Sequence, residues 1–299
     1  MNQIRLGKST LKVSQLGLGC INFGTTIHEE QAFELMNTYV RCGGNFLDTA
    51  NNYAIWNGGD GSESEKTIGR WLKQEDNRRY VILATKLGAK PSNTNTNDFT
   101  DMQGLGRKTI LDSVRESLEN LQTDYLDLLY LHVDDFKTPQ EETMATLSEL
   151  VDTGLIRAIG CSNFYTWRIE SIRKICEKYN YHFFSAIQQR YSYLTPTIDM
   201  DFYPQVAVDQ GLQKYIEYYS DLTLVAYSPL LNGQYNHQQI LHEGYDTLFN
   251  QVKLKKLLEE EKNPNQWVLK YIMQQFGGSA TLLTTSSIEH LKETMNWFK

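Results

Sequence analysis

Four side chains that can hold or move a proton follow one another along the chain, next to runs of apolar residues. Asp48 lies at the end of NFLD and Tyr53 comes five residues later, while Lys86 ends YVILATK and His132 ends LDLLYLH. In an eight-stranded α/β barrel, reactive groups lie at the C-terminal ends of the strands and in the loops that follow. If these runs are successive strands, the four side chains meet at one rim as a proton-donating site built on a phenol.

This combination suits the protonation of a carbonyl oxygen. A ketone that accepts a hydride becomes an alkoxide-like oxygen and needs a proton, which a phenol with a pKa near about 10 gives up reluctantly. A nearby ammonium favours the phenolate and lowers that pKa. We therefore expect Tyr53 to be the general acid, Lys86 to tune it and Asp48 to anchor Lys86. His132 would orient the carbonyl or join the proton relay. The hydride must come from a cofactor, because no side chain supplies one.

The rest of the chain contains the elements that such a rim requires. Eight nearly continuous apolar runs alternate with helical patterns, which is typical of parallel strands covered by helices. The runs lie near residues 16–20, 45–50, 80–86, 126–132, 158–163, 186–191, 223–229 and 281–286. No segment has the composition of a domain linker. The sequence predicts an α/β fold, one (β/α)8 TIM barrel over residues 1–299, with an N-terminal β-hairpin at 4–17 that plugs the barrel.

Composition excludes several classes of protein. The net charge is −7 and no block of Lys and Arg interrupts it, which disfavours a nucleic-acid or anionic-membrane surface. Neither a signal peptide nor a membrane-spanning run is recognisable, and the four cysteines form no C-x-x-C pair that would indicate zinc or disulfides. We expect a soluble, reduced, cytoplasmic protein that acts on a small molecule and holds no metal.

The segments around the four residues resemble the aldo-keto reductase family. GGNFLDTANNY with SESEKTIGRWL is similar to the family's aspartate and tyrosine segment, and LDLLYLHVDD through GCSNF resembles its histidine-to-nicotinamide segment. The opening RLGKSTLKVSQLGLG resembles the hairpin and first strand of the longer bacterial and potassium-channel-β-like branch. The resemblance runs from about residue 4 to the final helix. It implies reduction of an aldehyde or ketone, with NADPH (or NADH) extended across the C-terminal rim.

The resemblance also implies roles for individual residues. It gives Asp48, Tyr53, Lys86 and His132 the roles derived above, and it implies a set of cofactor contacts. Amides and hydroxyls suit a neutral carboxamide because they offer both donors and acceptors. The nicotinamide carboxamide would be held by Ser162 and Asn163 with Gln188 as their partner. Tyr227 would stack on the nicotinamide ring, and Ser228 and Leu230 would lie at the pyrophosphate.

The last segment, LLTTSSIEHLKETM, departs from the family pattern. The family often offers Lys or Arg to the adenosine 2′-phosphate and then Glu-Asn, whereas here Glu293 is followed by threonine. The candidate contacts are Thr284, Thr285, Ser286, His290 and Glu293. Because a bidentate arginine is the stronger phosphate partner, we expect NADPH use with weakened discrimination against NADH, unless Arg190 compensates.

Three segments exceed the usual connection length, at 89–105, 192–208 and 230–248. We expect them at the C-terminal rim, where they would form a substrate pocket and a cofactor clasp. The chain ends soon after its last helix, so these loops must supply the pocket walls. The aromatic candidates are Trp56, Phe99 and Tyr193.

Two other functions are compatible with parts of the sequence. A metal-dependent hydrolase would use His132 with Asp134 and Asp135, but a second histidine at a strand end is missing. A nucleotide-sensing or regulatory protein would keep the same site with little turnover. A dinucleotide fold of the G-x-G-x-x-G type is disfavoured because Asn22 stands at the third glycine, and no G-x-S-x-G is present.

Overall fold

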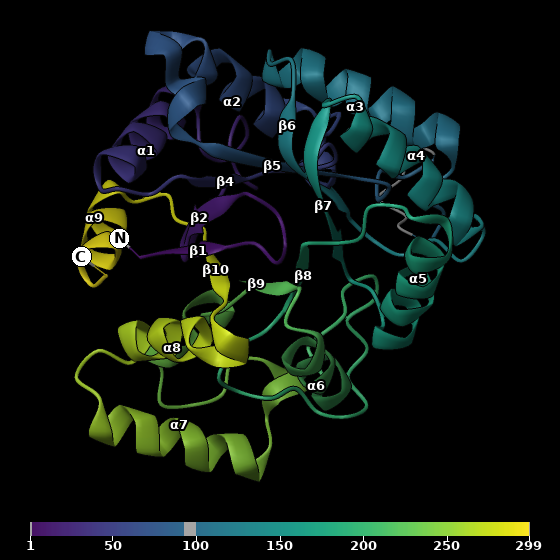
Figure 1. The fold of residues 1–299 in the computed structure, drawn as a ribbon. Coiled ribbons are helices and arrows are strands. Elements are labelled where there is room, and N and C mark those ends of the chain that lie inside the picture. Colours follow the sequence, from purple (N-terminus) through teal and green to yellow (C-terminus); the bar gives the residue numbers. More distant parts are fainter. Residues whose placement is uncertain (1, 93–99, 299) are drawn as a thin grey trace.

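The computed structural model describes residues 2–92 and 100–298, and its centre is a closed barrel of parallel strands (Figure 1). Around the barrel the order is β10-β3-β4-β5-β6-β7-β8-β9. The strands are β3 (Leu16–Gly19), β4 (Phe46–Asp48), β5 (Ile82–Leu87), β6 (Leu126–Leu131), β7 (Ile156–Ser162), β8 (Ala186–Arg190), β9 (Thr223–Tyr227) and β10 (Ala280–Leu283). The predicted (β/α)8 barrel is confirmed.

Several strands end earlier than the apolar pattern indicates. The ladder between β5 and β6 closes with Leu87 opposite Leu131, so His132 lies one residue beyond its strand. The 281–286 run is a strand only as far as Leu283. Polar and small residues at the end of each run belong to the rim, where the chain leaves the pairing ladder and turns into the loops.

Helices cover the outside of the barrel (Figure 1). They are α1 (Glu29–Arg41), α2 (Glu63–Leu72), α3 (Arg107–Leu121), α4 (Gln140–Asp152), α5 (Thr166–Tyr179), α6 (Gln210–Tyr219), α7 (Leu248–Glu260), α8 (Pro264–Met273) and α9 (Ile288–Asn296). Short 3₁₀ turns lie at η1 (Ile55–Asn57), η2 (Gln74–Tyr80), η3 (Leu231–Asn236), η4 (Glu243–Tyr245) and η5 (Gln275–Gly277). Among the residues described, no helix is both long and apolar enough to cross a bilayer.

Local sequence signals explain where individual helices begin. The N-cap of α8 is Asn263, whose side chain accepts a hydrogen bond from the Gln266 main-chain nitrogen over 3.2 Å, with Pro264 in the first turn. The N-cap of α9 is Ser287, which accepts from the His290 nitrogen over 3.1 Å. Both helices therefore start where side-chain caps satisfy main-chain donors that have no partner inside the helix.

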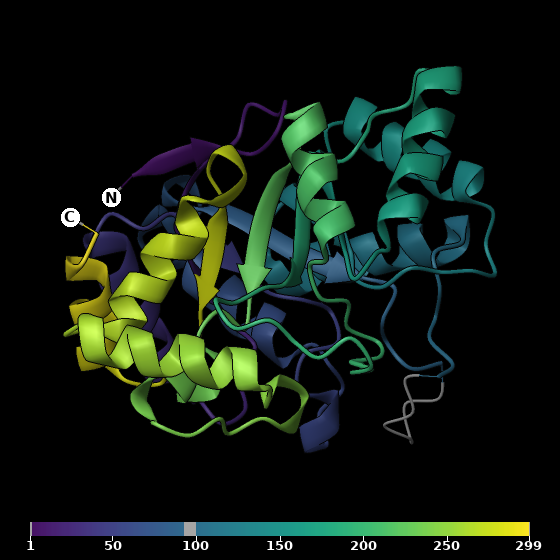
Figure 2. The ribbon, with the colours of Figure 1, turned by 90° about the horizontal axis from the view of Figure 1, so that it is seen from below.

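The N-terminal hairpin closes one end of the barrel. β1 (Gln3–Arg5) pairs antiparallel with β2 (Lys12–Ser14), and Leu6, Leu11 and Val13 pack with the apolar side chains of the barrel interior. Figure 2 shows the hairpin, in purple, at the end opposite the one to which β9 and β10 point. Gly7 has a φ of +48°, and a Cβ there would collide with the carbonyl oxygens of Ser185 and Asp221. The hairpin is thus seated tightly on the N-terminal end, as predicted.

Side chains at alternate strand positions point into the barrel, which gives the interior two levels. Phe46, Ala84 and Ala186 belong to an apolar cluster that includes the hairpin residues. Two residues further along the same strands stand Asp48, Lys86 and Gln188, all buried. The apolar level is therefore the floor of a polar level that lies at the C-terminal rim.

Candidate active site

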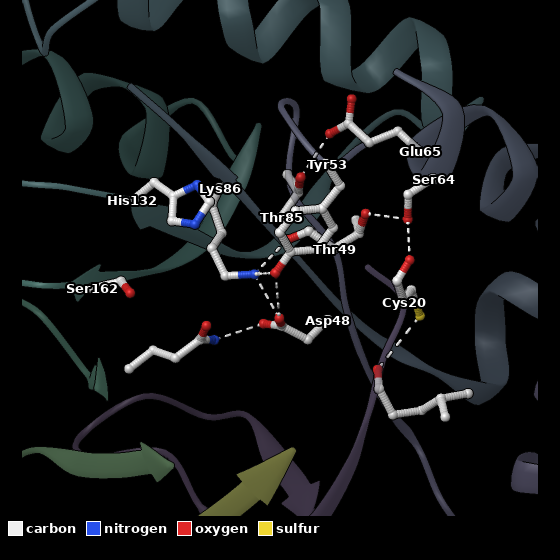
Figure 3. Close-up of polar contacts among 12 residues, drawn as sticks. Cys20, Asp48, Thr49, Tyr53, Ser64, Glu65, Thr85, Lys86, His132 and Ser162 are labelled. Carbon is white, nitrogen blue, oxygen red and sulfur yellow. Dashed lines mark hydrogen bonds and ion pairs between the residues drawn. The ribbon is translucent and has the colours of Figure 1, made fainter. Parts of the chain in front are cut away.

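Lys86 is the centre of the polar level, and its side chain is fully buried. Its Nζ donates to Asp48 Oδ1 over 2.5 Å, to the Thr49 carbonyl oxygen over 2.7 Å and to Tyr53 Oη over 2.6 Å (Figure 3). An ammonium has three N–H donors, so this set of acceptors uses all of them. Three of the four residues that the sequence singles out thus share one hydrogen-bonded group.

Burial sets the protonation state of this group. Burial raises the pKa of the Tyr53 phenol well above its ordinary value, and the Asp48 carboxylate adds to the rise. Burial also lowers the pKa of the Lys86 ammonium, an effect that the neighbouring Asp48 carboxylate opposes. Desolvation of the phenol therefore outweighs any lowering of its pKa that the nearby ammonium would give. Tyr53 therefore carries its proton throughout the neutral range.

His132 lies beside Tyr53 at the end of β6. Its ring meets the Tyr53 ring edge to face, with 6.1 Å between centroids and an interplanar angle of 75°. Its Nδ1 is buried and makes no hydrogen bond within the described part of the chain. Burial and the Lys86 ammonium hold the pKa of His132 well below its ordinary value. The imidazole is consequently neutral and can donate one hydrogen bond without carrying charge.

A cavity of about 830 Å³ opens next to these side chains at the C-terminal rim. Asp48, Tyr53 and His132 line it, whereas Lys86 lies behind them. Of the residues expected to contact a cofactor, those lining the cavity are Ser162, Asn163, Gln188, Tyr227, Ser228, Leu230 and Thr284. Strand ends far apart in the sequence therefore meet at one cavity.

The amide of Asn163 joins several of these strand ends. Its Nδ2 donates to the His132 carbonyl oxygen over 2.9 Å and to Ser162 Oγ over 3.1 Å. Its Oδ1 accepts from Tyr227 Oη over 2.7 Å and from the Val206 nitrogen over 3.1 Å. A side-chain amide offers two donors and two lone pairs, so all four positions are used. Asn163, with a φ of +60°, thereby fixes the loop after β8 against the ends of β6 and β9.

The family model for the Aldo/keto reductase family matches residues 15–299. The chain belongs to this family. An uncharacterized oxidoreductase of Bacillus subtilis is 36% identical over 234 residues, which are 78% of this chain and 68% of that protein. Norsolorinic acid reductase B of Dothistroma septosporum is 31% identical over 212 residues, which are 68% of this chain and 52% of the fungal protein. The match therefore spans about half of that fungal relative.

Solved structures of aldo-keto reductases have the same architecture. AKR11C1 of Bacillus halodurans, in its holo form, superimposes with a TM-score of 0.77 at 28% identity, covering 100% of this chain and 91% of that one. The similarity extends over the whole length, so the barrel and its rim belong to the shared fold. The resemblance noted in the sequence is confirmed at the level of the family and of the fold.

The long rim segments contribute to the cavity unevenly. Trp56 lines it, as do Pro204 and Gln205 from the segment after β8 and Leu231 to Gly233 from the segment after β9. The expectation for Tyr193 is wrong, because its ring packs against Trp267 and Tyr271 of α8, with centroids 4.9 and 5.3 Å away. Phe99 lies outside the described residues.

The far end of the expected cofactor site lies outside this cavity. Thr285, Ser286, His290 and Glu293 do not line the cavity, and only Thr284 reaches it. Thr285 Oγ1 accepts from the Ser287 nitrogen over 3.1 Å at the start of α9, while Ser286, His290 and Glu293 are exposed. These residues follow the last pair of the β10 ladder and turn onto the outer surface with α9.

Arg190 does not reach the cavity to supply a missing cation. Its guanidinium donates to Tyr245 Oη over 3.0 Å and to Gln205 Oε1 over 2.9 Å. Among the residues that the structure describes, neither lysine nor arginine lines the cavity. The cavity wall is therefore neutral apart from the Asp48 carboxylate.

Sequence reasoning missed some lining residues, including Asn22, Asn52 and Val133. Asn52 and Val133 are immediate neighbours of Tyr53 and His132, so the same motifs contain them. Both carboxylates of the hydrolase alternative have other partners. Asp134 accepts two hydrogen bonds from Arg168, of 2.6 and 2.8 Å, and Asp135 accepts from the Leu105 nitrogen over 2.8 Å and from Thr138 Oγ1 over 2.6 Å. Within residues 2–92 and 100–298, no three His, Cys, Asp or Glu side chains are close enough to hold a metal ion.

Proposed function

We propose that this protein reduces an aldehyde or ketone to the alcohol, using NADPH or NADH, with Tyr53 as the proton donor. The observation that carries the proposal is the buried contact of Lys86 with Tyr53 and Asp48 beside a neutral His132, at the wall of one cavity. The nicotinamide cofactor supplies the hydride when bound. The protein's own residues must then hold the carbonyl and deliver a proton.

Tyr53 is suited to deliver that proton at its Oη. A buried phenol keeps its proton at neutral pH, and the Lys86 ammonium donates to the same oxygen. As the proton leaves, the developing phenolate is stabilised by this charge-assisted hydrogen bond, which preorganised donors provide without reorganising in the reaction. Asp48 keeps Lys86 oriented and favours its charged form.

His132 is suited to orient the carbonyl oxygen. A neutral imidazole donates one hydrogen bond and adds no positive charge next to Lys86. Its edge-to-face contact with Tyr53 places both side chains at the same part of the cavity. Two donors, one of them a transferable proton, thus converge on the region where a carbonyl oxygen would be bound.

The residues present fit a nicotinamide cofactor. The cavity of about 830 Å³ falls within the range of about 300–1,000 Å³ typical of ligand sites, and hydroxyl and amide groups from Ser162, Asn163 and Gln188 line it. Ser162, Asn163 and Gln188 would hold the carboxamide, with Asn163 exchanging one of its four present partners for it. Tyr227 would lie against the ring, and Ser228 with Leu230 would contact the pyrophosphate. The candidate 2′-phosphate contacts at Thr284, Thr285 and Ser286 include neither lysine nor arginine, which supports the use of both NADPH and NADH.

Relatives support the reaction class without defining a substrate. They are named as an oxidoreductase in Bacillus and a norsolorinic acid reductase in a fungus. The pocket wall formed by Trp56, Pro204 and Leu231 favours a substrate with apolar or aromatic surface. We propose only the class of aldehydes and ketones for this chain.

The deciding experiment measures oxidation of NADPH, and separately of NADH, by a panel of aldehydes and ketones. Tyr53→Phe removes the proton and keeps the ring, so it should bind nucleotide normally while reduction falls by about 10²- to 10⁴-fold. Equal reduction by wild type and variant would refute Tyr53 as the acid. Tight nucleotide binding without turnover in the wild type would favour the sensing or regulatory function.

A further inference from the structure

Gln188 reaches across the barrel to the proton-donating group. β8, which holds Gln188, is four places away from β4, which holds Asp48, in the closed order of strands. In a barrel of this size, strands four places apart face each other across the interior. The Gln188 Nε2 nevertheless donates to Asp48 Oδ2 over 2.7 Å. Both side chains are buried, with exposed fractions of 3% for Gln188 and 0% for Asp48.

The two oxygens of Asp48 have separate partners. Oδ1 accepts from Lys86 Nζ over 2.5 Å and from Tyr53 Oη over 3.5 Å. Oδ2 accepts from Gln188, the one donor that the described residues provide for it. A buried carboxylate oxygen without a donor carries a large desolvation cost. Gln188 therefore satisfies the half of the carboxylate that Lys86 leaves free.

This division fixes the orientation of the carboxylate. If the Asp48 carboxylate were held at Oδ1 alone, it could rotate about its terminal bond. The rotation would displace the Lys86 ammonium, which is bonded to Oδ1. Held at both oxygens from opposite sides of the barrel, the carboxylate keeps Lys86 against Tyr53 Oη. Small errors in the placement of reacting groups are costly in rate, so a second anchor of this kind matters for turnover.

We propose that Gln188 is a positioning residue, which holds Asp48 from across the barrel so that Lys86 stays on the Tyr53 phenol. The inference deepens the proposed function and depends on it for its kinetic consequence. It differs from the role implied by family resemblance, in which Gln188 serves only the nicotinamide carboxamide. The two roles predict different kinetic effects, because loss of the positioning contact lowers kcat, whereas loss of a carboxamide contact also weakens nucleotide binding.

The test is Gln188→Met, which keeps the length of the side chain and removes its donor. Loss of a hydrogen bond to a charged group should lower kcat about 10- to 100-fold, a larger factor than the loss of nucleotide affinity, which involves at most one carboxamide contact. Affinity can be measured without substrate from the quenching of the protein's tryptophan fluorescence, since Trp56 lines the cavity. A kcat within about threefold of wild type, with or without weakened nucleotide binding, would overturn the proposal.

Gln189→Met is the matched control. Gln189 is the next residue on β8, is equally buried, and its Nε2 donates to the Phe164 carbonyl oxygen over 3.1 Å rather than to the site. This variant should lose thermal stability and retain kcat. A similar loss of kcat in both variants would assign the effect to general destabilisation of β8 and overturn the positioning role.

A double-mutant cycle with Asp48→Asn separates this inference from the proposed function. In that background Gln188→Met no longer removes a donor from a charge, so its effects on kcat and on Tm should shrink to less than half. The measurement of Tm needs neither nucleotide nor turnover. If the wild type proves inactive, the proposed function fails, and the double-mutant cycle in Tm alone tests the inference. Additive changes in Tm would then show that Gln188 and Asp48 are not coupled and would overturn it.

Discussion

The fully buried Lys86 ammonium lies 2.6 Å from the Tyr53 phenol oxygen at the cavity wall. Replacing it by Lys86→Met removes the donor to Tyr53 and leaves the Asp48 carboxylate buried without its counter-ion. Breaking one partner of a buried pair costs about 3–5 kcal/mol in the free energy of unfolding. We expect that loss together with a fall in kcat of about 10²-fold or more.

Chemical unfolding and steady-state reduction assays measure both effects. Lys214→Met is a suitable control, because that lysine meets Glu217 at 2.7 Å in a pair whose two side chains are both exposed; such pairs contribute about 0–1 kcal/mol. A Lys86→Met protein that is as stable and active as wild type would contradict the account of the site.

The protonation states of the site predict a flat pH profile for reduction. His132 has a pKa well below its ordinary value, because protonation would add a buried charge next to Lys86, and Tyr53 has a pKa well above its ordinary value. Neither group therefore changes charge between about pH 6 and pH 9, where unperturbed histidine would titrate. We expect kcat to vary less than about twofold on the acid side of this window, whereas a fall toward its alkaline end would report deprotonation of Lys86, whose pKa burial lowers. An ionisation near pH 6.5 that disappears in His132→Gln would contradict this expectation.

The fold was predictable because buried parallel strands and their covering helices leave a strong periodic signal. The eight apolar runs and the hairpin all correspond to observed elements. The exact residue at which each strand ends was not predictable, because Ser, Thr and Asn at the rim are equally compatible with a β-ladder and with a turn. Tyr193 illustrates a second limit, since an aromatic ring suits a pocket wall and a helix-packing cluster alike.

The site was predictable in its members and less so in its contacts. Asp48, Tyr53, Lys86 and His132 follow from their positions at successive strand ends. The bond between Gln188 and Asp48 depends on closure of the barrel, which brings together residues 140 positions apart. The phenol pKa depends on how completely water is excluded, which no spacing of residues expresses. Long-range contacts and the extent of burial therefore could not be predicted from the sequence alone.

The residues expected at the 2′-phosphate predict relaxed nucleotide preference. Since Thr284, Thr285, Ser286 and His290 include neither lysine nor arginine, we expect kcat/KM for NADPH and NADH to differ by less than about tenfold. Ser286 is exposed just before the start of α9, so Ser286→Arg should be tolerated. A charged hydrogen bond to the 2′-phosphate is worth about 1.5–3 kcal/mol, which would raise the preference for NADPH at least about tenfold.

The measurement is kcat/KM for each nucleotide with one carbonyl substrate. The NADH values act as an internal control, because NADH lacks the 2′-phosphate and should respond little to the new guanidinium. A wild-type protein that strongly prefers one nucleotide would show that groups other than those at residues 284–293 set the preference.

Glu65 on α2 predicts a pH-dependent effect on stability that is separate from the site's chemistry. Its carboxyl is fully buried between α2 and β5, where it accepts from Thr85 Oγ1 over 2.6 Å and from Asn120 Nδ2 over 3.2 Å (Figure 3 shows the contact with Thr85). Burial raises its pKa above the ordinary value, although these hydrogen bonds oppose the rise. The folded protein thus binds this proton more tightly than the unfolded chain does.

The sign of the effect follows from that difference. A raised carboxyl pKa contributes stability at low pH, and the contribution is lost as pH rises through the folded-state pKa. The Gln side chain of Glu65→Gln cannot ionise and keeps an acceptor for Thr85. The Tm of this variant should therefore rise relative to that of the wild type as the pH increases. We expect little difference in Tm near pH 4.5 and an advantage of roughly 2 °C for the variant at pH 8. Glu34→Gln, at an exposed position of α1, should show no such trend, and a Tm difference for Glu65→Gln that is independent of pH would contradict the burial of an ionisable carboxyl as its cause.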